Sequence, residues 1–200
     1  MPLHPTAQLI LDHAIVIIEE HGEAHLRIQE LTREAGVSVP SVYHFYGSRE
    51  GVIEAAHAER FSRSLTLAIE VFEGWVSSCE TEAEFREAVS KILDFMFVPE
   101  HASYRIQRIS ALGNTLGRPE LATRIGELSR QHNASLVAML TPAQEQGWIR
   151  AELDLSAFAY WVAGQLLGRI YIEVGQDAAS DGAWNAVSAE ATLFLLFGAS

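Results

Sequence analysis

Four neighbouring side chains in residues 39–44 are of the types that contact the edges of DNA bases. Ser41 and His44 can each hydrogen-bond to a base edge, and they lie three residues apart, about one turn of a helix. Val39 and Pro40 can pack against the methyl group of thymine. We interpret this segment as a candidate surface for reading a base sequence.

Two residues that follow suit the phosphate backbone of DNA. Ser48 is a good N-cap for a following helix, and the free N–H groups at the start of such a helix attract phosphate. Arg49 adds a positive charge at the same place. The sequence therefore predicts phosphate contacts here, which position a protein on DNA, next to contacts that read bases.

Two short helices and a tight turn would have to position these side chains. The first helix is predicted from one face at the spacing i, i+3, i+4 and i+7, made by Ile28, Leu31, Thr32 and Ala35. The second has its own face at the same spacing, made by Val39, Val42, Tyr43 and Tyr46. Gly36 can take the positive φ that ends the first helix, and Ser38 can cap the second, with Pro40 in its first turn.

A helix, a glycine-containing turn and a second helix form the helix-turn-helix pattern, whose second helix enters the DNA major groove. The alternative is a helical hairpin inside a core, which has the same spacing. The flanking sequence favours the helix-turn-helix over the hairpin. Residues 10–53 resemble the N-terminal domain of TetR-family repressors, with a first helix ILDHAIVIIEEHG, then I-x-x-L-x-x-x-A-G-V-S, then V-Y-x-F-Y-x-S-R.

The resemblance implies roles for two tyrosines. It implies that the Tyr43 hydroxyl reaches a phosphate and that Tyr46 is buried. The sequence departs from the family at Leu26 and Arg27, where a Thr or Ser usually caps the helix, so the cap is either lost or replaced by a neighbour. It also departs at Phe45, where His or Tyr is common.

The remaining chain predicts an all-α protein of about nine helices. The expected division is a helix-turn-helix DNA-binding domain over residues 1–50 and a helical effector-binding and dimerisation domain over residues 51–200. A long helix from Ser48 past Trp75 is expected to join them. The stretch GWIRAELDLSAFAYWVAGQLLGR is similar to the turn and penultimate helix of many family members.

The net charge of −12 argues against binding to nucleic acid without regard to sequence. Residues 1–60 hold four arginines against nine acidic residues, a net charge of −5, whereas residues 27–49 have a net charge of +1. Any DNA contact is therefore expected to be local. Such a surface predicts low nonspecific affinity that depends on salt.

No cofactor, metal or catalytic site is expected. His13, His21 and His25 could suggest a metal site, but Gly22 breaks the helix between the last two. The chain has no H-E-x-x-H motif, nucleophile elbow or phosphate loop. The single cysteine, Cys79, suits a reducing cytoplasm, and neither a signal peptide nor an apolar run of about 18 residues is present, so no membrane is expected.

Two C-terminal segments, residues 155–174 and 183–197, are apolar on more than one side. Such helices must be buried from several directions, and a four-helix bundle made with a second copy would do this. The alternative is an ordinary core helix pair. The residues expected at the interface of the homodimer are Trp161, Gly164, Gly168, Tyr171 and Phe194.

Aromatic and methionine side chains are candidates for the wall of an effector cavity, although ordinary core packing would also explain them. These residues are Trp75, Phe95, Met96, Tyr104, Met139, Trp148 and Tyr160. The sequence predicts a ligand-responsive transcriptional repressor that binds an inverted-repeat (palindromic) operator in double-stranded DNA as a homodimer and is released by a small, mostly apolar effector. The alternatives are a dimeric helical adaptor of the same fold without DNA binding and an all-helical enzyme.

Overall fold

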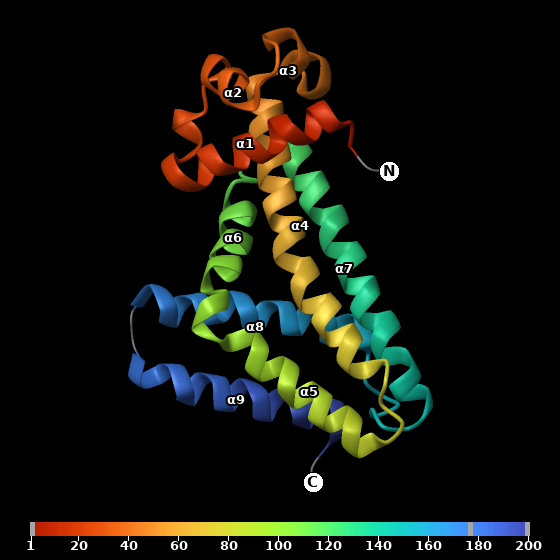
Figure 1. Cartoon of the computed structure of the whole chain (residues 1–200). Coiled ribbons are helices and arrows are strands. Elements are labelled where there is room, and N and C mark those ends of the chain that lie inside the picture. Colours follow the sequence, from red (N-terminus) through yellow and green to blue (C-terminus); the bar gives the residue numbers. More distant parts are fainter. Residues whose placement is uncertain (1–2, 176–177, 199–200) are drawn as a thin grey trace. The chain divides into compact units, whose positions relative to one another are not determined.

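A computed structural model describes residues 3–175 and 178–198, and over these residues the chain forms nine α-helices, two 3-10 turns and no strand (Figure 1). The elements are α1 (Pro5–His21), η1 (Glu23–His25), α2 (Ile28–Ala35), α3 (Val39–Tyr46), α4 (Arg49–Val76), α5 (Glu82–Phe97), η2 (Pro99–His101), α6 (Ala102–Gly113), α7 (Pro119–Glu145), α8 (Leu155–Gly175) and α9 (Ala178–Phe197). The predicted all-α fold is confirmed.

The helices divide between two compact units. The first unit runs to Ser62 and also takes in Ala111–Ile125, which includes the start of α7. The second unit consists of Arg63–Ser110 and the chain from Gly126 onward. Helices α4, α6 and α7 thus contribute residues to both units. Within the described residues, no helix combines the length and the apolar character needed to cross a membrane.

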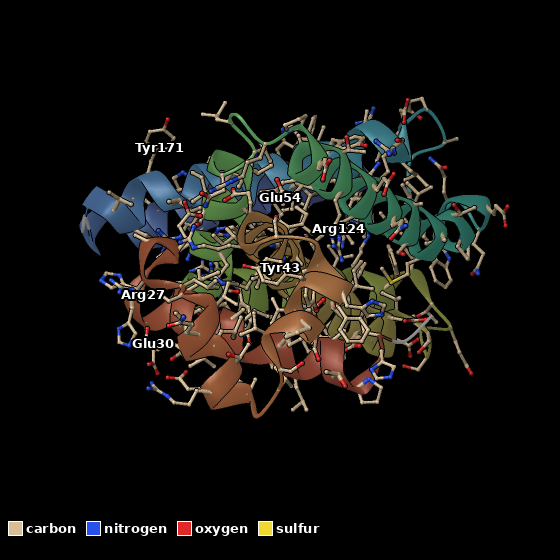
Figure 2. All side chains as sticks on the ribbon, turned by 90° about the horizontal axis from the view of Figure 1, so that it is seen from above. Arg27, Glu30, Tyr43, Glu54, Arg124 and Tyr171 are labelled. Atoms are coloured by element: carbon tan, nitrogen blue, oxygen red, sulfur yellow. The ribbon has the colours of Figure 1, made fainter. Side chains whose placement is uncertain are left out.

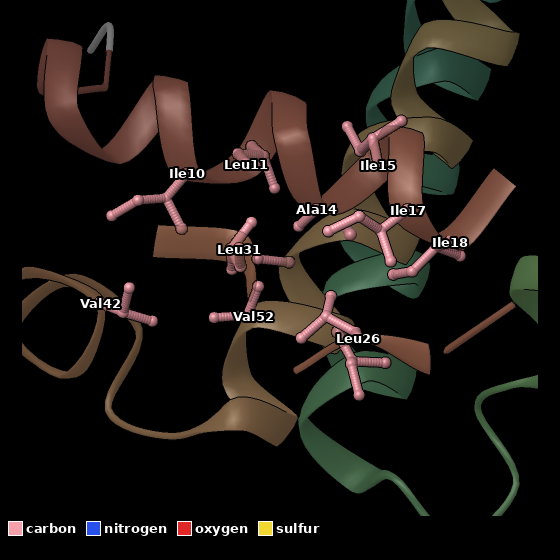
Figure 3. Close-up of a cluster of buried hydrophobic side chains, with 13 residues drawn as sticks. Ile10, Leu11, Ala14, Ile15, Ile17, Ile18, Leu26, Leu31, Val42 and Val52 are labelled. Atoms are coloured by element: carbon pink, nitrogen blue, oxygen red, sulfur yellow. The ribbon is translucent and has the colours of Figure 1, made fainter. Parts of the chain in front are cut away.

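The core of the first unit consists of aliphatic side chains from α1 to α4 (Figure 3). Helix α1 supplies Ile10, Leu11, Ala14, Ile15 and Ile18. Leu26, Leu31, Val42 and Val52 complete the cluster, and each is almost inaccessible to solvent. Full burial stabilises a side chain of this size by about 1.5–3 kcal/mol, so this cluster holds the short helices α2 and α3 in place.

The turn between α2 and α3 has the predicted local structure. Helix α2 ends at Gly36, whose φ of 65° is in the left-handed region that favours glycine. Ser38 caps α3, because its Oγ accepts a hydrogen bond from the backbone N–H of Ser41 at 3.3 Å. At the start of α2, Arg27 makes no side-chain cap hydrogen bond, so the cap that the family usually has is lost.

The second unit has an apolar core that α5, α8 and α9 share with the second half of α7 and the turn after it. Helix α5 begins with the predicted capping box, in which Thr81 and Glu84 satisfy each other's backbone N–H groups. Phe85 of α5 is buried against Trp148 and Phe197. Helices α8 and α9 lie side by side in Figure 1.

Helix α7 is longer than the sequence indicated. A proline inside a helical pattern usually ends the helix before it, but α7 continues to Glu145 with Pro142 inside it. Pro142 has no backbone N–H, so one hydrogen bond of the last turns is missing. The helix tolerates this loss because Pro142 lies near its end. The hydroxyl of Thr141 also donates to the carbonyl of Val137 at 2.8 Å.

Candidate nucleic-acid interface and effector cavity

Helix α3 presents an exposed face that includes most of the predicted base-reading residues. Val39, Pro40 and His44 are exposed, and half of the Tyr43 surface is accessible to solvent. Figure 2 labels Tyr43 on this helix. The opposite side of α3 packs into the core through Val42. This helix of eight residues therefore has one anchored side and one free side.

Tyr46 anchors the end of α3. Its hydroxyl donates a hydrogen bond to the carbonyl of Ala7 in α1 at 2.7 Å, and burial raises the pKa of this hydroxyl to about 12. Tyr46, expected to be buried, is half-buried and packs against the core of the first unit. Tyr43 lies on the same predicted helix face but is exposed, because the contacts of Val42 and Tyr46 with the core determine which side of α3 faces inward.

Ser41 is tied to the helix cap. Its hydroxyl lies 2.8 Å from the hydroxyl of Ser38, and its side chain is only half exposed. Ser38 therefore contacts both the backbone N–H and the side chain of Ser41. His44 has no comparable polar contact among the described residues; its ring packs edge-on against Phe45.

Arg49 makes hydrogen bonds within the first unit. Its Nε donates to the carbonyl of Leu26 at 2.7 Å, and one Nη donates to the carbonyl of Glu23 at 2.5 Å. Both carbonyls belong to the segment that connects α1 to α2. The guanidinium thereby positions the start of α4 against the entry to α2. Ser48 caps α4 through the N–H of Gly51 at 3.0 Å, as predicted for a helix N-terminus.

Arg27 is a further candidate for phosphate contact that was not selected from the sequence. It is exposed and stands immediately before α2, whose first N–H groups receive no side-chain cap (Figure 2). A positive charge beside free N–H groups at a helix N-terminus is a suitable site for phosphate. The signal was present in the sequence, because Arg27 occupies the position of the missing cap.

Glu23 is the centre of a charged network in the first unit. Its two carboxylate oxygens contact Arg118 Nη2 at 3.0 Å and His57 Nε2 at 3.1 Å. Arg118, which directly precedes α7, also pairs with Glu50 of α4. The hydrogen bond from Arg118 is the largest cause of the lowered pKa of Glu23, whereas burial lowers the pKa of His57. These ion pairs hold Arg118, and with it residues 111–125, against the rest of the first unit.

The second unit contains a cavity formed by residues of α4, α5, η2, α6 and α8. It includes about 330 Å³ of empty space, counted together with its opening to solvent. The lining residues are Ser64, Phe95, Met96, His101, Tyr104, Arg105, Arg108 and Leu166. Because this value includes open solvent, the enclosed part of the cavity is smaller than 330 Å³.

Three of the seven predicted effector residues, Phe95, Met96 and Tyr104, line this cavity. The other four lie elsewhere in the second unit. Trp75 packs edge-on against Phe95 at 6.1 Å between ring centroids, and Trp148 packs against Phe85. Met139 packs against the apolar core, and Tyr160 is exposed. The structure therefore brings together the candidates from α5 and α6.

Two arginines of α6 give the cavity a charged wall that the sequence did not predict. Arg105 is 2% exposed, and its guanidinium is paired with Glu173 of α8, with a further hydrogen bond from Nη1 to the carbonyl of Met96 at 2.7 Å. Arg108 is 8% exposed, and among the described residues it donates only to the hydroxyl and carbonyl oxygens of Ser64. Burial and the charge of Arg105 lower the pKa of Arg108 to about 10, so Arg108 stays positive at neutral pH.

Helices α8 and α9 expose several of the residues predicted for a dimer interface. Tyr171 is 85% exposed, and Figure 2 shows it pointing away from α8; Phe194 of α9 is 53% exposed. A Cβ atom at Gly164 would meet no atom of the other described elements within 4 Å, whereas one at Gly168 would meet Trp184 of α9 at 3.4 Å. Trp161 is half-buried and stacks on Phe158 within the chain.

Comparison with known proteins gives a family match in the N-terminal part of the chain and weaker similarities over most of its length. Residues 10–56 match the model of the family described as bacterial regulatory proteins, tetR family. This match confirms the resemblance found in the sequence. The match covers the helix-turn-helix and the first part of α4.

Longer similarities extend over nearly the whole chain. A fatty acid metabolism regulator protein of Bacillus subtilis (strain 168) is 18% identical over 162 residues, which are 81% of this chain and 80% of that protein. A transcriptional regulator FadR from Bacillus subtilis, in complex with stearoyl-CoA, superposes with a TM-score of 0.61 at 20% identity, covering 96% of this chain and 99% of the other. A TetR-family transcriptional regulator from Rhodococcus sp. has a TM-score of 0.70 at 18% identity, over 96% and 98% of the two chains. At these identities, the solved structures establish the shared fold.

Proposed function

We propose that this chain, whose residues 10–56 match the tetR-family model, is a ligand-responsive DNA-binding transcriptional repressor. Residues 1–50 bind an inverted-repeat operator in double-stranded DNA, and residues 51–200 bind a small effector and form a homodimer. The proposed role is not catalytic. Because its target is chromosomal DNA, the proposed site of action is the cytoplasm.

The exposed face of α3 carries this proposal. Helix α3 is anchored on one side by Val42 and Tyr46, and its free side offers Val39, Tyr43 and His44. An anchored helix with a free side of this kind can enter the major groove and place side chains against base edges. The exposed Arg27 and the N-terminus of α4 supply groups for phosphate contact.

The cavity of the second unit supports a small-molecule effector. Phe95, Met96 and Leu166 give it an apolar part. The stearoyl-CoA in the similar Bacillus subtilis structure is consistent with an effector that has an apolar part. Helix α4 runs from Arg49 to Val76 and contributes residues to both units, so it is the proposed link between effector binding and DNA binding.

The proposed homodimer rests on the outer face of α8 and α9. Tyr171 and Phe194 expose large apolar surfaces there, and Gly164 leaves room for a close approach by another helix. Exposed apolar side chains that gather on two helices are typical of an interface. A two-fold dimer requires two half-sites in the operator, separated by about one turn of DNA or slightly more.

Selection of binding sites from random duplex DNA with the purified full chain tests the function. The expected result is an inverted-repeat sequence whose binding weakens steeply as salt increases. A selection that returns no enriched sequence would contradict the repressor. It would support the second candidate, a dimeric adaptor of the same fold. One observation favours this candidate: the hydrogen bonds of Arg49 to two carbonyls occupy guanidinium donors that were expected to contact a phosphate.

A further inference from the structure

The charge of Arg108 has no carboxylate partner among the described residues. Its Nε and one Nη donate to the hydroxyl and the carbonyl of Ser64, which are neutral groups. These bonds satisfy donors of the guanidinium but do not neutralise it. A buried cation without a counter-ion is costly, and proteins usually pair it or use it to bind an anion.

The neighbouring charges do not supply the missing anion. Glu173 is paired with Arg105, the other arginine of the cavity wall. His132, whose ring is influenced by the charge of Arg108, is held neutral at pH 7 by its burial. The remaining polar lining groups, the hydroxyl of Tyr104 and the ring of His101, supply no carboxylate. The two arginines and one glutamate leave this wall with a net positive charge.

The rest of the cavity wall is apolar. Phe95, Met96 and Leu166 form this part, and the ring of Phe95 lies 4.2 Å from that of His101 between centroids. The site therefore combines an apolar surface with a cation, Arg108, that has no carboxylate partner among the described residues. The chain as a whole has a net charge of −12, so a local cation is what would allow an anion to bind here.

We propose that the effector is an amphipathic organic anion, whose acid group pairs with Arg108 while its apolar part packs against Phe95, Met96 and Leu166. This inference rests on the proposed function and specifies the chemical class of the effector. It changes the expectation of a mostly apolar ligand, because a planar guanidinium binds a carboxylate or a phosphate through two parallel hydrogen bonds. The acid group can be either of these two.

Calorimetric titration of the full chain, without DNA, tests the proposal with three probes that share one alkyl chain: decanoate, decyl phosphate and 1-decanol. At least one of the two anions should bind about tenfold or more tightly than the alcohol, because charge-assisted hydrogen bonds exceed neutral ones in strength. The tighter of the two anions identifies the preferred acid group. Equal affinity for all three probes, or no saturable binding of either anion at millimolar concentration, would overturn the proposal.

Two variants locate the charge that is responsible. Arg108→Met should remove the preference for the anion and leave the affinity for 1-decanol within about twofold, because methionine keeps an apolar side chain at this position. Lys91→Met removes one positive charge from the exposed side of α5 and should keep the wild-type preference. A preserved preference in Arg108→Met would overturn the proposal. If that variant does not fold, Arg108→Lys, which keeps the charge but loses the paired donors, should reduce the preference, and an unchanged preference would contradict the role.

Failure of this proposal is distinguishable from failure of the proposed function. DNA binding is measured separately, with the selected operator in the presence and absence of each probe. Release of the operator by 1-decanol as effectively as by the anions would leave the repressor intact and overturn the anionic effector. Arg108-dependent anion binding with no selected DNA sequence would leave the cavity assignment intact and contradict the repressor.

Discussion

The Nε of Arg49 donates to the carbonyl oxygen of Leu26 over 2.7 Å, so the first residue of α4 holds the segment that enters α2. A second bond from Arg49 to the carbonyl of Glu23 fixes the same segment. Arg49 therefore contacts the backbone of its own chain, whereas its position in the sequence predicted a contact with DNA phosphate. Arg27, by contrast, is exposed at the start of α2.

Arg27→Ala should weaken DNA binding to a similar extent on the selected operator and on mismatched DNA, and should lower the slope of log affinity against log salt by about one. The reason is that a phosphate contact carries no sequence information. Binding measured over a series of salt concentrations provides the test, with Lys91→Ala as a control for the loss of one charge. A loss confined to the matched operator would show that Arg27 reads a base instead.

Arg49→Ala should lower the free energy of unfolding by about 1–3 kcal/mol, because the carbonyl of the buried Leu26 loses a donor and the carbonyl of Glu23 keeps only the N–H of Leu26. Denaturant unfolding of the full chain, followed by circular dichroism, measures this change. A fully stable Arg49→Ala protein whose salt slope falls by about one would contradict the structural role and restore the phosphate contact.

His44→Ala should cost about 1–3 kcal/mol on the preferred operator and relax the preference at one or two base pairs, because His44 is exposed on the free face of α3. Ser41→Ala should also reduce stability, since its hydroxyl contacts the capping residue Ser38. Repeating the site selection with each variant checks both effects. Unchanged base preferences in both variants would rule out this readout.

Tyr171→Glu should dissociate the homodimer at micromolar protein concentration, because it places a charge on the proposed interface of α8 and α9. Leu116→Glu is a matched control, since Leu116 is also 85% exposed but lies in the first unit. Sedimentation of wild type and both variants provides the measurement. A wild-type monomer, or a Tyr171→Glu dimer as stable as wild type, would contradict this interface.

The two glycines of α8 should respond differently to the same substitution. Gly164→Leu should affect only association, because the space beside Gly164 is open in the single chain. Gly168→Leu should also lower the melting temperature of the chain, since its side chain would meet Trp184 of α9. Sedimentation and thermal unfolding together separate the two effects, and equal melting temperatures would contradict the packing of Gly168 on Trp184.

His132→Gln should make stability less sensitive to acid. Burial, followed by the charge of Arg108, lowers the pKa of His132 to about 4 from its ordinary value of 6.5. Between these pH values the unfolded chain binds a proton that the folded chain does not, so stability falls as pH falls, with a slope approaching about 1.4 kcal/mol per pH unit from this group. The contribution is fully present above pH 6.5 and is lost by about pH 4.

Unfolding free energies of wild type and His132→Gln over pH 4–7.5 measure this contribution as the difference between the two slopes. The difference is needed because burial also lowers the pKa of His57, which acts in the same direction. His21→Gln, which removes an exposed histidine of α1, serves as the control. Parallel pH profiles for wild type and His132→Gln would show that the folded protein does not exclude a proton from His132.

The sequence by itself determined the local structure of this protein. The helical spacing around Leu31 and around Val42 depends on residues three or four positions away. The positive φ at Gly36 and the caps at Ser38 and Thr81 likewise depend on residues only a few positions away. Such interactions form inside a single helix or turn and can be read from spacing. For this reason the helix-turn-helix and most helix boundaries could be predicted, although α7 continued past the expected break.

Only the tertiary structure decided which charged side chains meet. Arg118 pairs with Glu23 across 95 positions, and Arg108 contacts Ser64 across 44. No periodic pattern encodes these pairs, because they depend on how separate helices pack, and the packing is decided by apolar burial distributed over the whole chain. Arg49, for which the neighbouring sequence predicted a phosphate contact, bonds to carbonyls of an earlier segment. Arg108 is part of a cavity wall because the fold places it beside Ser64 of α4.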